Sequence, residues 1–169
     1  DNIVIDSKSG YSGAGRNVHQ RYKNKNLYES LSAYGVGFHR HNSEIDQELK
    51  GISKKKINFI FTPHLSPMFR GILSTMYLET NEKKISDIHA YLKNFYKNKK
   101  FVKVLGSNAQ ISTNDVINTN NIHISICKTK YKNKFIILSA IDNLIKGGAG
   151  QAIQNMNIKF NFKINEGLK

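Results

Sequence analysis

The order of strand-like and helix-like segments predicts an α+β domain built on a largely antiparallel sheet. Most strand-like segments come in hairpin-like pairs, which makes neighbouring strands antiparallel. Two longer segments carry apolar side chains at helical spacing. The 169 residues suffice for one domain with its own core and are too few for two domains of ordinary size.

Glycines and a capping residue delimit the first elements. Residues 2–6 predict a short strand that runs into a glycine-rich loop at 9–16. Residues 31–38 are expected to be extended, although two glycines weaken this segment. Ser43, followed by an acidic residue three positions later, is typical of a helix start. We therefore expect a short helix from 43 to 50.

Proline and apolar spacing delimit the middle of the chain. A strand at 57–62 is expected to stop at Pro63, because proline restricts its own backbone and that of the preceding residue. Residues 64–69 then form a loop, and 71–79 form the next strand. A helix is expected over 86–96. Its apolar stripe consists of Ile85, Ile88, Leu92 and Phe95.

The last third of the chain contains the most apolar strand. Residues 101–105 and 122–128 predict strands separated by a polar loop. Residues 135–141 are the most apolar and are expected to lie centrally in the sheet. After Asp142 and Asn143 the pattern becomes helical. The small and apolar residues of this last helix are Ala149, Ala152, Ile153 and Met156.

The chain is strongly basic, with 26 Lys and Arg against 12 Asp and Glu and a formal net charge of +14. Such a balance on its own suggests a nucleic acid or an anionic surface as partner. However, only four of the 26 are arginine, whose guanidinium binds phosphates and bases through two hydrogen bonds at once, unlike lysine. The lysines are scattered, so composition bias explains much of the excess. A basic RNA- or anion-binding module is kept as the alternative from another class.

Cysteine count and apolar runs exclude several classes of protein. The one cysteine, Cys127, cannot form an intramolecular disulfide or a cysteine zinc cluster. It lies in a strand pattern and is expected to be an unreactive sheet thiol. The apolar runs are too short to cross a membrane, and residues 1–6 lack the features of a signal peptide. A cytoplasmic protein is therefore expected.

The glycine-rich loop at 9–16 is the strongest local signal. Its three glycines permit close backbone approach, while Ser9 and Ser12 add hydroxyl donors and Arg16 adds a cation. Such a loop can hold a carboxylate or a phosphate, or it can be an ordinary turn. The order of the glycines fits neither a Walker loop nor a dinucleotide-binding fingerprint.

Histidines supply the second signal. If the segment is extended, His39 and His41 face the same way and can line one pocket, while Arg40 points elsewhere. Imidazoles exchange protons near neutral pH, so these two are candidates for acid–base work. A metal site is not favoured, because no third ligand is evident.

Two further connections place polar residues where a sheet ends. The proline-containing segment 62–70 would fix His64 and Arg70 at such an edge, where ligand contacts are common. Asp142 and Asn143 stand where the most apolar strand gives way to a helix, whose start offers free backbone amides. Either connection can equally be an ordinary turn.

Four long segments in one order carry a resemblance: 9–16 (SGYSGAGR), 39–45 (HRHNSEI), 61–73 (FTPHLSPMFRGIL) and 142–157 (DNLIKGGAGQAIQNMN). Together they resemble the N-acetyl-gamma-glutamyl-phosphate reductases, which reduce an acyl phosphate to a semialdehyde with NADPH in arginine biosynthesis. The resemblance implies a largely antiparallel mixed sheet with helices packed on one face. Such a sheet forms the C-terminal domain of glyceraldehyde-phosphate and aspartate-semialdehyde dehydrogenases.

The resemblance also implies a division of labour. Residues 1–169 correspond to the catalytic and dimerisation domain, while the dinucleotide-binding domain and the nucleophilic cysteine lie outside this sequence. His39 would be the general acid/base, and Asn143 would contact the nicotinamide of NADP. The residues that would bind substrate are Ser9, Ser12, Gly13, Arg16, His41, His64 and Arg70.

The implied partners are the acyl-phosphate substrate, the missing N-terminal domain and further copies of the chain, with neither a membrane nor a specific nucleic acid. A related acyl-phosphate reductase, of the aminoadipyl-carrier or aspartate-semialdehyde type, is the nearest alternative. The chain alone is expected to be inactive.

Overall fold

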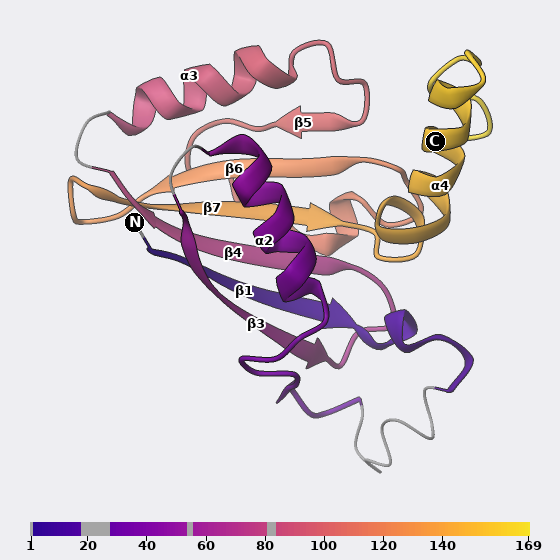
Figure 1. Ribbon diagram of the computed structural model, residues 1–169, viewed down its shortest axis with the longest axis horizontal. Coiled ribbons are helices and arrows are strands. Elements are labelled where there is room, and N and C mark those ends of the chain that lie inside the picture. Colours follow the sequence, from indigo (N-terminus) through magenta and orange to yellow (C-terminus); the bar gives the residue numbers. More distant parts are fainter. Residues whose placement is uncertain (1, 18–27, 54–55, 81–83) are drawn as a thin grey trace.

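The computed structural model describes residues 2–17, 28–53, 56–80 and 84–169 and contains a seven-stranded mixed sheet (Figure 1). The strands are β1 (Asn2–Gly10), β2 (Ser32–Ala33), β3 (Asn58–Ser66), β4 (Ile72–Glu79), β5 (Val102–Val104), β6 (Ile122–Lys128) and β7 (Lys134–Ile141). The α-helices are α2 (His41–Ile52), α3 (Ile85–Tyr96) and α4 (Gly150–Lys159). Shorter helical turns are η1 (Tyr11–Asn17), η2 (Thr113–Asp115) and η3 (Ile145–Ala149).

The strand order is β2-β3-β1-β4-β7-β6-β5. Four of the six neighbouring pairs are antiparallel, and the β1–β3 and β5–β6 pairs are parallel. The predicted α+β class with a largely antiparallel mixed sheet is therefore confirmed. The apolar strand β7 lies inside the sheet as expected, but β4 holds the central position.

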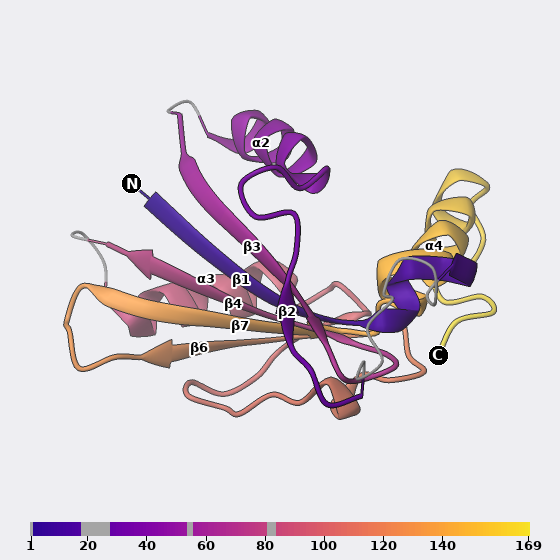
Figure 2. The same cartoon turned by 90° about the horizontal axis from the view of Figure 1, so that it is seen from below.

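Helices α2 and α3 lie over the same face of the sheet, which the resemblance predicted. Ile85, Ile88 and Leu92 of α3 pack on a core that includes Ile126 of β6 and Phe135 of β7. The strand register places this core on one face of the sheet, together with Met76 of β4 and Ile5 of β1. Helix α2 lies over the same face. Figure 2 shows α2 standing away from the sheet, while α4 lies beyond one end of the strands.

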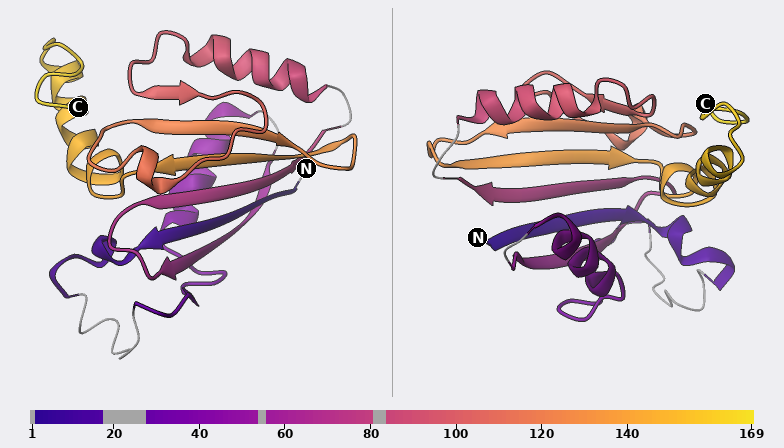
Figure 3. Two further views of the ribbon diagram at one scale, coloured as in Figure 1. Left: turned by 180° about the vertical axis from the view of Figure 1, so that it is seen from behind. Right: turned by 45° about the horizontal axis from the view of Figure 1, so that its top comes forward.

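The opposite face is partly covered by the segment between β5 and β6. This segment crosses beneath β6, where Val116 and Ser125 are buried. Figure 3 shows the strands from two further sides, with β1, β3 and β4 running past this cover. A row of apolar side chains there extends across β3, β1 and β4 and is exposed. The row consists of Ile60, Val4 and Tyr77.

Two local expectations were wrong, and a helix that was predicted has wider bounds than expected. The segment 31–38 forms only the two residues of β2, because Gly35 and Gly37 adopt positive φ angles that turn the chain. The glycine-rich loop becomes helical at η1 rather than staying irregular. The helix predicted from 43 to 50 begins earlier, at His41, and Arg40 occupies the position before it without a side-chain cap.

The strand predicted to stop before Pro63 instead continues to Ser66 as β3. The carbonyl of Pro63 accepts the backbone N–H of Tyr34, so its nitrogen also faces the β2 side, where the neighbouring strand has only two residues. A proline there removes no hydrogen bond to β1.

In α3, Phe95 does not join the core but stacks on Tyr91 at the surface. Within the described ranges, no helix combines the length and apolar character needed to cross a bilayer.

Candidate functional site

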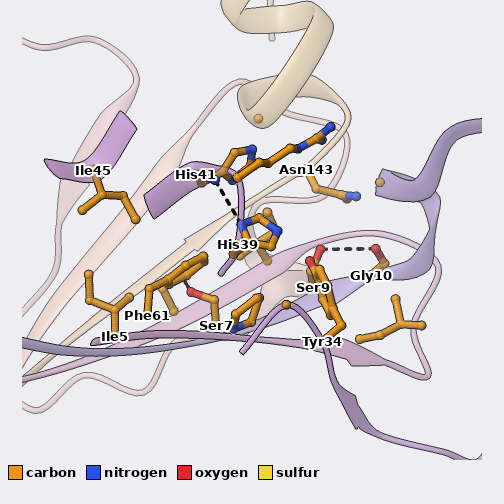
Figure 4. A pocket seen from close by; sticks show the side chains of 18 of the residues that line it. Ile5, Ser7, Ser9, Gly10, Tyr34, His39, His41, Ile45, Phe61 and Asn143 are labelled. Carbon is orange, nitrogen blue, oxygen red and sulfur yellow. Dashed lines mark hydrogen bonds between the residues drawn. The ribbon is translucent and has the colours of Figure 1, made fainter. Parts of the chain in front are cut away.

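A cavity of about 800 Å³ lies between the sheet and the start of α2 (Figure 4). Side chains of β1, β3 and β4 form its floor, and the segment from Tyr34 to Ile45 forms its roof. The connection after β7 closes one end with Asn143 and Gly147. The cavity thus combines an apolar floor with polar groups gathered near the end of β1, an arrangement typical of small-molecule sites.

His39 and His41 both line this cavity, as predicted, although the segment is not extended. Their rings are in edge-to-face contact with centroids 4.7 Å apart. The backbone N–H of His41 donates to Nδ1 of His39 at 3.3 Å. Neutral His39 therefore carries its proton on Nε2, which leaves that nitrogen free to act on a ligand. Because Arg40 begins a helical turn, it lines the cavity as well instead of pointing elsewhere.

The surroundings of His39 favour its neutral form. Burial lowers the pKa of His39 below its ordinary value, and the neighbouring charges of His41 and Arg40 lower the pKa further. Glu44 acts in the opposite direction. His39 is therefore mainly a neutral imidazole at pH 7, and its Nε2–H can donate to a ligand.

The glycine-rich segment contributes Ser9, Gly10 and Gly13 to the cavity wall. Three of its backbone amides are not free to hold an anion, because Gly10, Tyr11 and Ser12 donate to carbonyls of residues 68–71 at 2.8–3.0 Å. Tyr11 turns outward against an exposed Phe69. The segment thus supplies a wall tied to the start of β4. The side chain of Arg16 lies outside the described part of the chain.

Gly10 is required because the backbone of the next segment lies against it. A Cβ at this position would be 2.7 Å from the carbonyl oxygen of Phe69. We expect Gly10→Ala to lower the free energy of unfolding by about 2 kcal/mol or more, because two backbones would have to separate. Urea unfolding followed by circular dichroism measures this change.

Gly51→Ala is the matched control. Gly51 lies in α2, and a Cβ there has no neighbour within 4 Å. Alanine should stabilise this helix by about 0.5–1 kcal/mol relative to glycine. Equal effects of the two substitutions would contradict the close approach at Gly10.

Asn143 joins three separate segments at the end of the cavity. Its Oδ1 accepts the backbone N–H of Gly71 at 2.7 Å, and its Nδ2 donates to the hydroxyl of Ser12 at 3.0 Å. Ser12 is therefore buried behind the wall and does not line the cavity, because its hydroxyl is turned toward Asn143. One amide hydrogen of Asn143 is left for a ligand.

Arg70 and His64, both expected to bind substrate, do not line the cavity. The guanidinium of Arg70 instead contacts Asn118 and the buried carboxylate of Asp142. His64 lies on the opposite face of the sheet, where its Nδ1 is 3.1 Å from Asp6. The reason is that β3 continues through Pro63, so consecutive side chains alternate and Pro63 and Leu65 face the cavity instead.

Several cavity residues carry no motif that the sequence alone could reveal. The most polar of them are Ser7 and Ser74, whose hydroxyl oxygens are 2.8 Å apart. Alternation along the two strands could have shown the face of each serine, but not that the two serines are neighbours.

Cys127 lies on β6 on the face opposite the cavity. In the described part of the chain, no three His, Cys, Asp or Glu residues gather as a metal site would require.

Comparison with known proteins agrees with this fold. The chain belongs to the semialdehyde dehydrogenase family, because residues 1–143 match the model "Semialdehyde dehydrogenase, dimerisation domain". Among curated proteins, it is similar to N-acetyl-gamma-glutamyl-phosphate reductases. The one from Thermoanaerobacter pseudethanolicus is 45% identical over 99% of this chain, and one from Clostridium botulinum is 47% identical over 98%. The resemblance carried by the four motifs is thereby confirmed.

The chain spans about half the length of these relatives, 49% and 48% respectively. Among solved structures, an aspartate semialdehyde dehydrogenase II from Vibrio cholerae aligns with a TM-score of 0.68 at 13% identity, covering 94% of this chain and 55% of that one. The enzyme from Francisella tularensis aligns with a TM-score of 0.68 at 16% identity, over 92% and 57%. At such low identity these two comparisons support the fold alone.

Proposed function

We propose that this chain is the catalytic and dimerisation half of an NADPH-dependent reductase. The enzyme would convert N-acetyl-glutamyl 5-phosphate to N-acetylglutamate 5-semialdehyde in the cytoplasm, as a step of arginine biosynthesis. The observation that carries the proposal is the shared cavity of His39, His41 and the Ser9–Gly10 wall, in a chain that is 45% identical to such a reductase. The dinucleotide-binding half and the nucleophilic cysteine would come from a further stretch of polypeptide.

His39 is the acid–base group in this proposal. Its free Nε2 can exchange a proton with the substrate oxygen at the carbon being reduced. His41 holds the ring through its backbone N–H and its edge-to-face contact. Arg40, on the cavity wall, would hold the anionic groups of an acyl phosphate. Ser9 would do the same once its hydroxyl turns away from the carbonyl of Gly10, to which it donates at 3.3 Å.

The residues at the end of the cavity fit a nicotinamide ring. Asn143 lines the cavity and keeps one amide hydrogen for an acceptor such as a carboxamide oxygen. When bound, NADP(H) supplies the two electrons of the reduction. Because Gly71 and Ser12 fix both ends of the Asn143 amide, this contact would be rigidly oriented.

The C-terminal region fits the missing half as a partner. Apolar side chains are exposed from α4 to beyond its end, which is unusual for a surface that stays in water. They are Met156, Ile158, Phe160, Phe162 and Ile164. Asn157 holds the returning chain by donating to the carbonyls of Ile164 and Glu166, so this surface is ordered. We assign it to the contact with the N-terminal domain.

The exposed row of Ile60, Val4 and Tyr77 on the other face fits a second copy of the chain. This agrees with the dimerisation role named for the family. We expect Ile60→Asp to shift the protein toward monomers, because a carboxylate would lose water within the apolar row. Sedimentation velocity measures the shift. Ile52→Asp, at an exposed position of α2, is the control and should leave the oligomeric state unchanged.

Reconstitution tests the proposed activity. The 169-residue chain alone should not oxidise NADPH with N-acetyl-glutamyl 5-phosphate, whereas the chain joined to a matching N-terminal half should do so. Turnover by the chain alone, or none by the joined enzyme, contradicts the proposal. A panel containing aspartyl phosphate and a carrier-linked aminoadipyl phosphate distinguishes the related reductases.

An RNA-binding assay at increasing salt tests the alternative from another class. Binding through scattered lysines should fall steeply with ionic strength. RNA affinity that survives moderate salt would instead support a specific basic module.

A further inference from the structure

Two serine hydroxyls on the floor of the cavity have no part in the proposed chemistry. Ser7 on β1 and Ser74 on β4 are partners in the strand register, and both side chains face the cavity. Their oxygens are 2.8 Å apart, and Figure 4 shows Ser7 beneath the histidines. Serines at positions that would otherwise be core leave a polar spot in an apolar floor.

The hydrogen bonds of this pair are not exhausted. Each hydroxyl has one hydrogen and two lone pairs, and the bond between them uses one hydrogen and one lone pair. Among the described residues, neither hydroxyl has another partner. The pair therefore still offers one O–H donor and several acceptor sites to a group inside the cavity.

The surroundings select the kind of group that fits. Ile5 and Phe61, which are partners in the register of β1 and β3, line the floor two residues before Ser7 along β1. Ile72 lines it two residues before Ser74 along β4. Asp6 and Lys8, the charged neighbours of Ser7 in sequence, face the opposite side of the sheet, as does His64 on β3. An anion here would lose water without gaining a counter-charge, whereas a neutral secondary amide brings both an acceptor and a donor.

We infer that Ser7 and Ser74 bind the amide of the substrate's N-acetyl group, with the acetyl methyl against Ile5 and Phe61. This inference rests on the proposed function and adds to it the recognition of the N-acetyl group. Along β1 the pair lies two residues from Ser9, about 7 Å at the rise of a strand. That separation suits the short aliphatic chain between the amide and the acyl phosphate of this substrate.

The first test is kinetic and uses the joined enzyme with the double variant Ser7→Ala/Ser74→Ala. The reaction is followed in reverse, as phosphate-dependent reduction of NADP by N-acetyl-L-glutamate 5-semialdehyde and by an analogue with an ester in place of the amide. We expect the KM for the amide to rise about tenfold with kcat changed less than about threefold. The preference of the wild type for amide over ester should fall to about one.

Ser139→Ala is the matched control. Ser139 stands opposite Ser74 in the register of β7, on the same face of the sheet, but it is not among the residues that line the cavity. Its replacement should change neither the KM nor the amide preference. An unchanged KM and an unchanged amide preference in the double variant would overturn the subsite.

Calorimetry separates this inference from the proposed activity, because it needs no turnover. The joined protein should bind N-acetyl-L-glutamate more tightly than L-glutamate, and the double variant should lose about tenfold in affinity for the former. This result without reductase activity would support the subsite and refute the proposed reaction. Equal affinities for the two ligands in the wild type would overturn the subsite, whatever the activity.

Discussion

Replacing His39 with alanine should lower kcat of the joined enzyme by a factor of about 10²–10⁴, the usual contribution of a positioned acid–base group. The substitution removes the Nε2 atom that we propose exchanges a proton with the substrate oxygen. Because His39 lies at the cavity wall and its Nδ1 is held by His41, its loss should affect kcat more than KM. Steady-state kinetics with saturating NADPH measures both constants.

The pH profile gives a second readout of the same group. Burial and the neighbouring positive charges lower the pKa of His39, so the wild-type kcat/KM should fall only below pH 6.5, as the neutral ring becomes protonated. His39→Ala should abolish this acid limb. His64→Ala is the control, because His64 lies on the opposite face beside Asp6 and should leave kcat and the limb unchanged. A comparable loss of kcat in both variants would contradict the assignment to His39.

Asp142→Ala should lower the free energy of unfolding by about 3–5 kcal/mol, which is typical when one partner of a buried ion pair is removed. Asp142 is fully buried (0% exposed), and its carboxylate accepts the backbone N–H groups of Leu144, Ile145 and Asn118 at 2.8–3.0 Å. It also faces the guanidinium of Arg70 at 3.4 Å. Removing it leaves these donors without an acceptor, and urea unfolding measures the loss.

Asp115→Ala serves as the comparison for Asp142. Asp115 is also a carboxylate that accepts a backbone N–H, that of Ser112 at 2.9 Å, but it lies at the surface as part of a helix cap. Its removal should cost about 1 kcal/mol, because water can replace the lost acceptor. If both substitutions have the same small effect, the connection after β7 does not depend on Asp142.

Most secondary structure could be predicted because it depends on nearby residues. The apolar stripe of Ile85, Ile88 and Leu92 indicated α3, and the strand at 122–128 was predicted with the bounds that β6 has. The failures were also local in origin. Glycines with positive φ ended β2 early, and a proline on a nearly free strand edge did not end β3.

The candidate site was predicted only in part. His39, His41, Ser9, Gly13 and Asn143 meet at one cavity, as the motifs indicated. The other predicted residues that the structure describes do not line it. Ser12 is turned toward Asn143 and Arg70 toward Asp142, while His64 faces the other side of the sheet. Each of these positions depends on contacts between residues far apart in the chain.

By itself, the sequence determined the class of fold, the family and the main catalytic candidate, because periodic side chains and long motifs are properties of the chain alone. Only the tertiary structure decided which polar groups share a cavity. Side chains alternate along a strand, so extending β3 past Pro63 decided that His64 faces away, and the register of β1 with β4 brought Ser7 to Ser74. Such pairings depend on the packing of distant strands, which no local pattern records.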